Sequence, residues 1–308
     1  MARVAAIDCG TNSIRLLVAD VATDGTLREI DRRMTIVRLG EGVDATGAFS
    51  EAALMRTFAA CDEYAGVIAA HAVSNVRFVA TSASRDVSNR QEFVEGVQRR
   101  LGVEPDVISG HEEAELSFLG AKSGVAHDAA APFLVIDIGG GSTEFVLGDS
   151  TPEFARSVNI GCVRMTERHL AEDPVSQDSI ERATADIDAA IAEAAEHVPL
   201  DAAHTVIGLA GSVTTVAAMA LALEKYDRKA IHGSVVSAET VHRVAERLVK
   251  MSRAQRAELP FMHPGRVDVI GAGALVLDRI MHRLPQSQLV VSESDILDGI
   301  AIRLAGAR

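Results

Sequence analysis

The stretch "AAIDCGTNSIRLLVAD" at residues 5–20 recurs as "VIDIGGGSTEFVLGD" at residues 135–149, with equivalent residues 129 positions apart. In both copies an apolar run ends in aspartate, passes through glycine and small polar residues, and becomes apolar again. This pattern predicts two β-strands joined by a tight turn. The shared positions are Ile7 and Ile136, Asp8 and Asp137, Gly10 and Gly139, Ser13 and Ser142, and Asp20 and Asp149. The sequence therefore indicates a duplicated structural unit.

Both turns are rich in groups that can surround an anion. Glycine permits positive φ and removes bulk, so backbone N–H groups can converge on a phosphate, and small polar side chains can add donors. The candidate phosphate-binding residues are Gly10, Thr11, Asn12 and Ser13 in the first turn and Gly139, Gly140, Gly141, Ser142 and Thr143 in the second. Asp8 and Asp137 could hold a hydrated Mg²⁺ beside that phosphate. Asp-x-Gly also forms ordinary hairpin turns, but two copies in register favour a functional role.

The composition narrows the classes of partner. The chain has 308 residues, of which 48% are apolar and 4% aromatic, with no Trp and a formal net charge of −13. This length is sufficient for two domains. The scarcity of aromatic residues and the negative charge argue against a nucleic-acid partner. Because that charge also repels a polyanion, bound phosphate would need local amides, a cation and a few arginines.

The cysteines and the apolar segments indicate a cytoplasmic protein without a membrane span. Cys9, Cys61 and Cys162 are odd in number and form no C-x-x-C pair, which argues against a disulfide framework or zinc site. No signal sequence precedes the first predicted strand. Residues 206–223 are uncharged, but turn-forming residues in that run predict a buried strand followed by a buried helix.

Strands and helices mix in both halves, which predicts an α/β fold with two similar mixed sheets flanking an interdomain cleft. Helices are expected at about residues 50–72 and 178–197, and Ser88 with Gln91 has the pattern of a capping box. The segment "VAHDAAAP" reads as a linker. The expected domains are residues 1–124 and 125–308, with the last helix able to pack back on the first domain.

Seven segments resemble successive motifs of one protein family. They are "AIDCGTNSIRLLV", "VATSASRDVSN", "VISGHEEAELSFLG", "LVIDIGGGSTEFVLG", "NIGCVRMTE", "GLAGSVTTVAA" and "GRVDVIGAGALVLDRIM". Their order resembles the exopolyphosphatase and guanosine pentaphosphate phosphatase (Ppx/GppA) family of the actin, sugar kinase and Hsp70 superfamily. The resemblance implies two ribonuclease-H-like domains and a cytoplasmic hydrolase, often a homodimer, that removes the terminal phosphate of polyphosphate or pppGpp.

The resemblance also implies roles for individual residues. Glu113 would position and deprotonate water, and Arg85 would reach toward phosphate. Asp137 and Glu144 would hold Mg²⁺ or Mn²⁺. Asp8 remains a further candidate ligand because of its place at the end of the first predicted strand. Gly211 and Ser212 of the "GLAGS" turn join the phosphate-binding group. Without the resemblance, solvated surface carboxylates would be the ordinary interpretation of the glutamates in "HEEAE".

Two departures from the family pattern bear on the substrate. Asp295 and Asp298 stand in "VSESDILDGI", where many relatives carry a Gly-Leu-Arg segment, and are expected to make one wall of the cleft more acidic. Longer members continue into a helical domain related to HD phosphohydrolases, so its arginines and lysines would not hold a long chain here. The sequence therefore favours shorter polyphosphates.

Four functions remain open from the sequence. The leading one is an Mg²⁺-dependent exopolyphosphatase, and the alternative within the family is a pppGpp 5′-phosphohydrolase. A kinase or ATPase of the wider superfamily would share the hairpins and the "GLAGS" turn, but Arg85 and "HEEAE" argue against it. A polyphosphate sensor without turnover would need no water-activating base.

Overall fold

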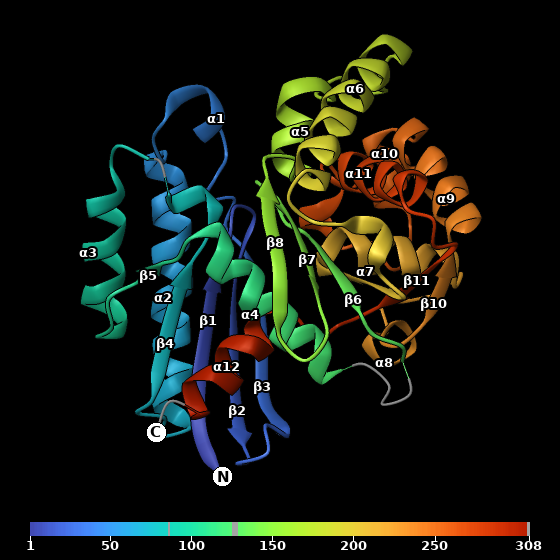
Figure 1. Cartoon of the computed structure of the whole chain (residues 1–308). Helices are drawn as coiled ribbons and strands as arrows, with labels where there is room; N and C mark the ends of the chain where they lie inside the picture. The colour runs from blue at the N-terminus through green and yellow to red at the C-terminus, as the bar shows by residue number, and fades with distance from the viewer. Residues whose placement is uncertain (86, 125–128, 307–308) are drawn as a thin grey trace. The chain divides into compact units, whose positions relative to one another are not determined.

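The protein is described by a computed structural model that covers residues 1–85, 87–124 and 129–306. The chain divides into two compact units (Figure 1). Unit 1 comprises Met1–Ser123 and Asp295–Arg308, and unit 2 comprises Gly124–Ser294. Residues 125–128 of the predicted linker lie outside the described residues.

Unit 1 is built on the first hairpin. Its elements are β1 (Ala2–Cys9), β2 (Ser13–Val21), β3 (Leu27–Ile36), α1 (Val43–Thr46), α2 (Glu51–Ala70), β4 (Val76–Ala80), a 3₁₀ turn at Ser82–Ser84, α3 (Arg90–Leu101), β5 (Asp106–Val107), α4 (Gly110–Ser123) and α12 (Ile296–Gly306).

Unit 2 is built on the second hairpin. Its elements are β6 (Phe133–Ile138), β7 (Thr143–Gly148), β8 (Pro152–Val158), α5 (Cys162–His169), α6 (Gln177–Ala195), a 3₁₀ turn at Leu200–Ala202, β9 (Thr205–Leu209), α7 (Ala210–Ala220), α8 (Arg228–Ile231), β10 (Val235–Ser237), α9 (Ala238–Lys250), α10 (Arg253–Ala257), a 3₁₀ turn at Pro264–Arg266, α11 (Ile270–Arg283) and β11 (Gln288–Val291).

The two sheets have the same topology. Unit 1 has the order β3-β2-β1-β4-β5, with the first three strands antiparallel and the last two parallel to β1. Unit 2 repeats this order as β8-β7-β6-β9-β11 and adds β10 antiparallel at the edge. The predicted fold class, two ribonuclease-H-like domains with mixed sheets, is therefore confirmed.

Both predicted hairpins are present and close in the same way. The amide of Gly10 donates to the carbonyl of Ser13 at 3.0 Å, and the amide of Gly139 donates to the carbonyl of Ser142 at 3.0 Å. Each hydrogen bond spans a turn of two residues between the paired strands. The repeated sequence thus produces a repeated backbone.

Side-chain alternation along β1 explains why the unit 1 sheet is covered on both faces. Ala5 and Ile7 pack into the cluster that contains buried residues of α2 and α3. Val4 and Ala6 point to the opposite face and pack with residues of α4 and α12. In Figure 1, α12 crosses in front of this sheet. Because successive strand residues point to opposite faces, Asp8 belongs to the α12 face.

The structure corrects one helix start and confirms one strand-to-helix division. Ser88 does not cap α3, because its hydroxyl donates to the carbonyl of Gly47 and Asn89 occupies the N-cap position without a side-chain cap bond. The apolar run from residue 206 divides into β9 and α7 as predicted. Within the described residues, no helix is both long and apolar enough to cross a membrane.

Glycines allow α4 and α12 to pack at very short range. A Cβ at Gly120 would lie 1.7 Å from the carbonyl oxygen of Asp295, and one at Gly299 would lie 2.0 Å from the carbonyl oxygen of Leu116. Both obstacles are backbone atoms, which cannot rotate away. Any side chain at these positions would therefore force the two helices apart.

We expect Gly299→Ala to lower the free energy of unfolding by about 1–3 kcal/mol or more, because it overpacks the contact between α4 and α12. Gly66 in α2 is a matched control, since a Cβ there would meet nothing within 4 Å. Gly66→Ala should stabilise by up to about 1 kcal/mol through helix propensity. Urea unfolding measures both, and equal effects of the two substitutions would contradict the packing argument.

Candidate active site

The two predicted catalytic residues lie in contact in unit 1. Glu113 is in the first turn of α4, where its amide donates to the carbonyl of Ser109 at 2.9 Å, and its side chain is buried. Arg85 follows the 3₁₀ turn after β4, and its Nη2 forms an ion pair with Oε2 of Glu113. The Nε of Arg85 donates to the carbonyl of Ile108 at 3.1 Å. This second bond fixes the guanidinium beside the carboxylate.

The neighbouring glutamates have different partners and are more exposed. Glu112 pairs with Arg77 at 2.8 Å, and Glu115 pairs with Arg303 at 3.1 Å. Each of these carboxylates is about one-third exposed, whereas the side chain of Glu113 is 11% exposed. Helical spacing therefore separates one buried carboxylate from two surface pairs, as expected from divergence of about 100° per residue.

In unit 2, two buried carboxylates lie directly opposite one another. Asp137 of β6 pairs in register with Glu144 of β7, and both side chains are buried. The hydroxyls of Ser142 and Ser157 each donate to Oε1 of Glu144 at 2.6 Å. Cross-strand neighbours lie about 5 Å apart, and like charges there are unfavourable. Carboxylate oxygens are the ligands that Mg²⁺ takes, so this donor set fits a hard divalent cation.

Backbone carbonyls of the glycine turn in unit 2 accept hydrogen bonds from the start of α5. The amide of Cys162 donates to the carbonyl of Gly139 at 2.9 Å, and that of Val163 donates to the carbonyl of Gly140 at 2.8 Å. The backbones approach so closely that a Cβ at Gly161 would lie 2.3 Å from the carbonyl carbon of Gly140. The segment "NIGCVRMTE" therefore fixes the turn.

Unit 1 repeats this arrangement with different residues. The amide of Arg38 donates to the carbonyl of Asn12 at 2.9 Å, and the amide of Gly40 donates to the carbonyl of Thr11 at 2.9 Å. Oγ1 of Thr11 lies 3.0 Å from Oγ of Ser82, within hydrogen-bond distance. Both turns are thus preorganised by the segment that follows the third strand of their sheet.

These features fit the family suggested by the motifs, and a direct comparison decides the question. The model of the Ppx/GppA phosphatase family matches residues 17–307. The chain belongs to this family.

Relatives within the Ppx/GppA family align over nearly the whole chain. Exopolyphosphatase 2 of Mycobacterium tuberculosis is 48% identical over 318 aligned residues, which cover 99% of each chain. A crystal structure of an exopolyphosphatase-like protein has a TM-score of 0.95 at 45% identity, covering 100% of this chain and 99% of that one. The Aquifex aeolicus member of the Ppx/GppA family has a TM-score of 0.83 at 28% identity, covering 99% and 97%.

The first hairpin of this Ppx/GppA chain pairs a carboxylate with an arginine, where the second hairpin has two carboxylates. Asp8 faces Arg15 across β1 and β2, at the position equivalent to Glu144 in the second copy. Nε and Nη2 of Arg15 donate to Oδ2 of Asp8 at 3.0 and 2.6 Å. Burial raises the pKa of Asp8, and Arg15 offsets part of this rise. Asp8 is thus paired with an arginine across its hairpin, whereas its counterpart Asp137 faces a second carboxylate, Glu144.

Arg15 also contacts one of the two C-terminal aspartates, Asp295 and Asp298, and this contact changes how their charge is interpreted. Nη1 of Arg15 pairs with Asp295, and Nη2 of Arg32 pairs with Asp298 at 2.6 Å. Burial opposes ionisation of Asp295, but Arg15 and Arg32 outweigh it and hold its pKa below the usual value. Both aspartates are buried. Contrary to the prediction of added acidity, each carboxylate is paired with an arginine of unit 1.

Sequence reasoning missed Arg266 as a candidate phosphate ligand. Gly211 lies at the start of α7, where Ala210 has a φ of 66°, and a Cβ at Gly211 would lie 2.6 Å from Cζ of Arg266. Nη1 of Arg266 donates to Oγ1 of Thr215 at 3.2 Å, and Ser212 packs beside Gly273. The available signal was the arginine of the quoted "GRVDVIGAGA" segment. The structure brings it to the "GLAGS" turn.

Arg15→Met should destabilise unit 1 by about 3–5 kcal/mol at pH 7.5, because it leaves two buried carboxylates without their shared cation. Asp295 has a lowered pKa in the folded protein, so its ion pairs contribute stability above its unfolded pKa of about 3.9 that is lost as pH falls. The difference between wild type and variant should therefore persist from pH 7.5 to about pH 4 and shrink as the pH falls below that value.

Arg28→Met is the matched control for urea unfolding. Arg28 pairs with Asp20, but its side chain is 66% exposed. Arg28→Met should therefore lower the free energy of unfolding by at most about 1 kcal/mol. The proposal that Arg15 neutralises two buried carboxylates would be contradicted if Arg15→Met lowered the free energy of unfolding equally at every pH. It would also be contradicted if that decrease were no larger than the decrease for Arg28→Met.

Proposed function

We propose that this protein is an exopolyphosphatase that hydrolyses the terminal phosphoanhydride of linear inorganic polyphosphate in the presence of Mg²⁺. The observation that carries the proposal is the ion pair between the buried carboxylate of Glu113 and the guanidinium of Arg85. It joins a carboxylate able to accept a proton to a guanidinium able to bind phosphate. The relative named Exopolyphosphatase 2 supports the choice of polyphosphate.

The ion pair defines the state before substrate binds. Before polyphosphate binds, the Glu113 carboxylate accepts a hydrogen bond from the guanidinium of Arg85. Arginine also binds phosphate oxygens in a bidentate fashion. On polyphosphate binding, Arg85 transfers its hydrogen bond from Glu113 to a terminal phosphate oxygen. The freed carboxylate then orients a water molecule.

The chemical step needs one base and no covalent intermediate. The water oxygen bonds to the terminal phosphorus while Glu113 accepts a proton from that water. The bond from phosphorus to the bridging oxygen breaks, and the shortened chain leaves with that oxygen. Orthophosphate and a chain one phosphate shorter are the products.

The glycine turns and the arginine near α7 bind the remaining phosphates. Turn carbonyls are engaged by neighbouring amides, which favours turn N–H groups as the donors to anionic oxygens. The proposed phosphate-binding residues are Gly10, Thr11, Asn12, Ser13, Gly139, Gly140, Gly141, Ser142, Thr143, Gly211, Ser212 and Arg266. Among them, the amides of Gly10 and Gly139 close the two turns, and the other residues supply the donors. These groups offset the repulsion between a chain of net charge −13 and its substrate.

Asp137 and Glu144 are the proposed residues for a divalent cation. Mg²⁺ bound there would neutralise charge on the transferred phosphoryl group. Glu144 is oriented by two serine hydroxyls, whereas Asp8 is oriented by Arg15. Asp8 is therefore proposed to position Arg15 and to contribute less to the cation.

Glu113→Gln should lower kcat by roughly 10² to 10⁴-fold, because glutamine keeps the size of the side chain but cannot accept a proton from water. Polyphosphate affinity should change little. Glu112→Gln is the matched control, since Glu112 is on the same helix but pairs with Arg77. The assignment fails if both variants lose activity equally, or if Glu113→Gln keeps more than about a tenth of the rate, which is less than 1.4 kcal/mol.

Asp137→Asn should raise the Mg²⁺ concentration needed for half-maximal activity, because it removes one of two carboxylate ligands. The decisive readout is calorimetric titration of Mn²⁺ into wild type and variant. Affinity should fall at least about tenfold, a free-energy change of 1.4 kcal/mol. Full activity of the wild type in excess EDTA would refute the cation requirement.

The substrate assignment is tested by measuring the activity of the protein on polyphosphate and on pppGpp. Orthophosphate release from polyphosphates of graded length is compared with chromatographic turnover of pppGpp. The proposal expects a higher kcat/KM for polyphosphate, with shorter chains preferred. A higher kcat/KM for pppGpp would assign the alternative function, and a steady rise into hundreds of phosphates would refute the preference for short chains.

A homodimer and a cytoplasmic location complete the proposal. Family analogy and the frequency of twofold symmetric assemblies support the dimer. A scattering mass near 32.6 kDa at micromolar concentration would show a monomer instead.

A further inference from the structure

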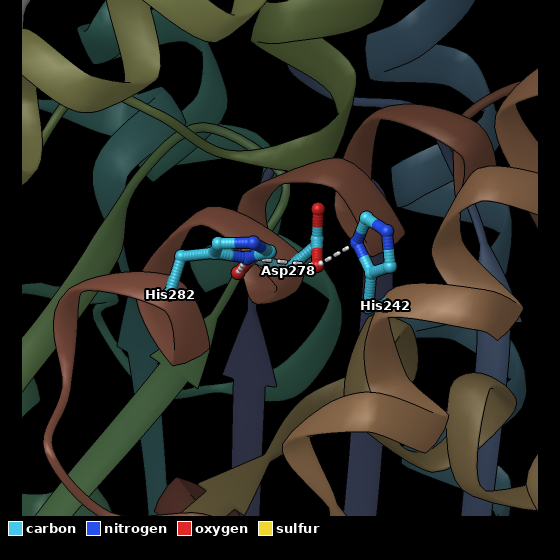
Figure 2. A group of neighbouring side chains, drawn as sticks. All are labelled: His242, Asp278 and His282. Carbon is cyan, nitrogen blue, oxygen red and sulfur yellow. Dashed lines mark hydrogen bonds and ion pairs between the residues drawn. The ribbon is translucent and has the colours of Figure 1, made fainter.

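A second cluster of metal-ligating side chains lies in unit 2, on helices that the proposed reaction does not use. His242 of α9 and Asp278 and His282 of α11 place one potential ligand atom each within 4.8 Å of the others. Figure 2 shows both imidazole rings directed toward the carboxylate between them. Asp278 and His282 are four residues apart, so they share one face of α11.

The distances are suited to a shared metal ion. Nδ1 of His242 lies 3.1 Å and Nδ1 of His282 lies 3.3 Å from Oδ1 of Asp278. Tetrahedral ligands at about 2.0–2.1 Å from Zn²⁺ are themselves separated by about 3.4 Å. Both separations from the carboxylate oxygen are therefore close to the spacing of ligands that share one ion.

Burial and helix geometry add to this arrangement. The Asp278 side chain is 10% exposed, whereas those of His242 and His282 are 53% and 48% exposed. A buried carboxylate is therefore flanked by two imidazoles that a metal ion can reach from solvent. His282 is in the last turn of α11, where the helix dipole favours positive charge.

We infer that His242, Asp278 and His282 form a binding site for a divalent transition-metal ion, with Zn²⁺ as the best candidate. Imidazole nitrogen favours Zn²⁺ and related ions, whereas Mg²⁺ prefers oxygen ligands. This site is therefore chemically distinct from the carboxylate pair proposed for Mg²⁺. Three protein ligands leave the fourth tetrahedral position open to water.

The competing interpretation is a hydrogen-bonded trio in which both imidazoles donate to Asp278, and Nδ1 of His282 also lies 3.1 Å from the backbone carbonyl oxygen of Asp278. The same short distances satisfy that arrangement, so metal binding has to be measured. The neighbouring charges do not compete strongly for an ion. Glu246 on α9 is engaged by Lys250 at 2.6 Å, and Arg279 on α11 is held by Asp188 of α6 at 2.8 Å.

Bound metal would link α9 to α11. Both helices contribute buried residues to the main core of unit 2. A ligand that binds only the folded state raises its stability by mass action. Zn²⁺ should therefore raise the melting temperature of the protein.

The test is calorimetric titration of Zn²⁺ into the EDTA-treated and dialysed full chain, without polyphosphate, because phosphate oxygens would compete for the ion. One equivalent of Zn²⁺ should bind in addition to any ion held by Asp137 and Glu144, with a rise in melting temperature. His282→Ala and His242→Ala should each weaken that binding at least about tenfold, and both are exposed enough to leave the fold intact. Mg²⁺-dependent phosphatase activity of the two variants should stay unchanged.

His169→Ala is the matched control, because His169 also contacts a carboxylate, that of Asp186 at 2.9 Å, but lies outside the cluster. It should bind Zn²⁺ as the wild type does. Absence of Zn²⁺ binding by the wild type would overturn the inference. Equal affinity of wild type, His242→Ala and His282→Ala would also overturn it, since the ion would then bind elsewhere.

Discussion

The antiparallel register within each hairpin determines which side chains face each other beside its turn. In unit 1 it sets Asp8 opposite Arg15, and in unit 2 it sets Asp137 opposite Glu144. The first copy therefore pairs a carboxylate with an arginine, whereas the second sets two carboxylates opposite each other, and the proposed cation site rests on that second pair. A register shift of one residue would send these groups to the opposite face.

The balance of charge in unit 1 depends on this register. Arg15 pairs with Asp8 on the neighbouring strand and with Asp295 just before α12. The close packing of α12 on α4 then relies on glycine at both contact points. Since α4 also carries Glu113, the candidate base is fixed to the sheet through the same elements. The duplicated hairpin thus carries an ion pair in unit 1 and two facing carboxylates in unit 2.

Local pattern was sufficient to predict the elements but not their long-range partners. The hairpins and the division of the apolar run at residue 206 were predictable because periodicity and turn residues are local signals. The capping prediction for Ser88 was wrong because its hydroxyl bonds to Gly47, which is distant in sequence. Asp295 was misjudged for the same reason, since Arg15 is 280 residues away.

The candidate site required the family resemblance as well as local pattern. Three glutamates in "HEEAE" have similar local sequence, and only the tertiary contact with Arg85 distinguishes Glu113. The resemblance named both residues, and the structure places them together. Arg266 was missed because only packing against Gly211 shows its position.

The most direct test of the proposed hydrolysis is a single turnover on polyphosphate in water enriched with heavy oxygen, H₂¹⁸O, followed by mass spectrometry of both products. Attack of water on the terminal phosphorus predicts one heavy oxygen in the released orthophosphate and none in the shortened chain. Unlabelled orthophosphate, or transfer of the phosphoryl group to a nucleotide or sugar acceptor, would contradict the account.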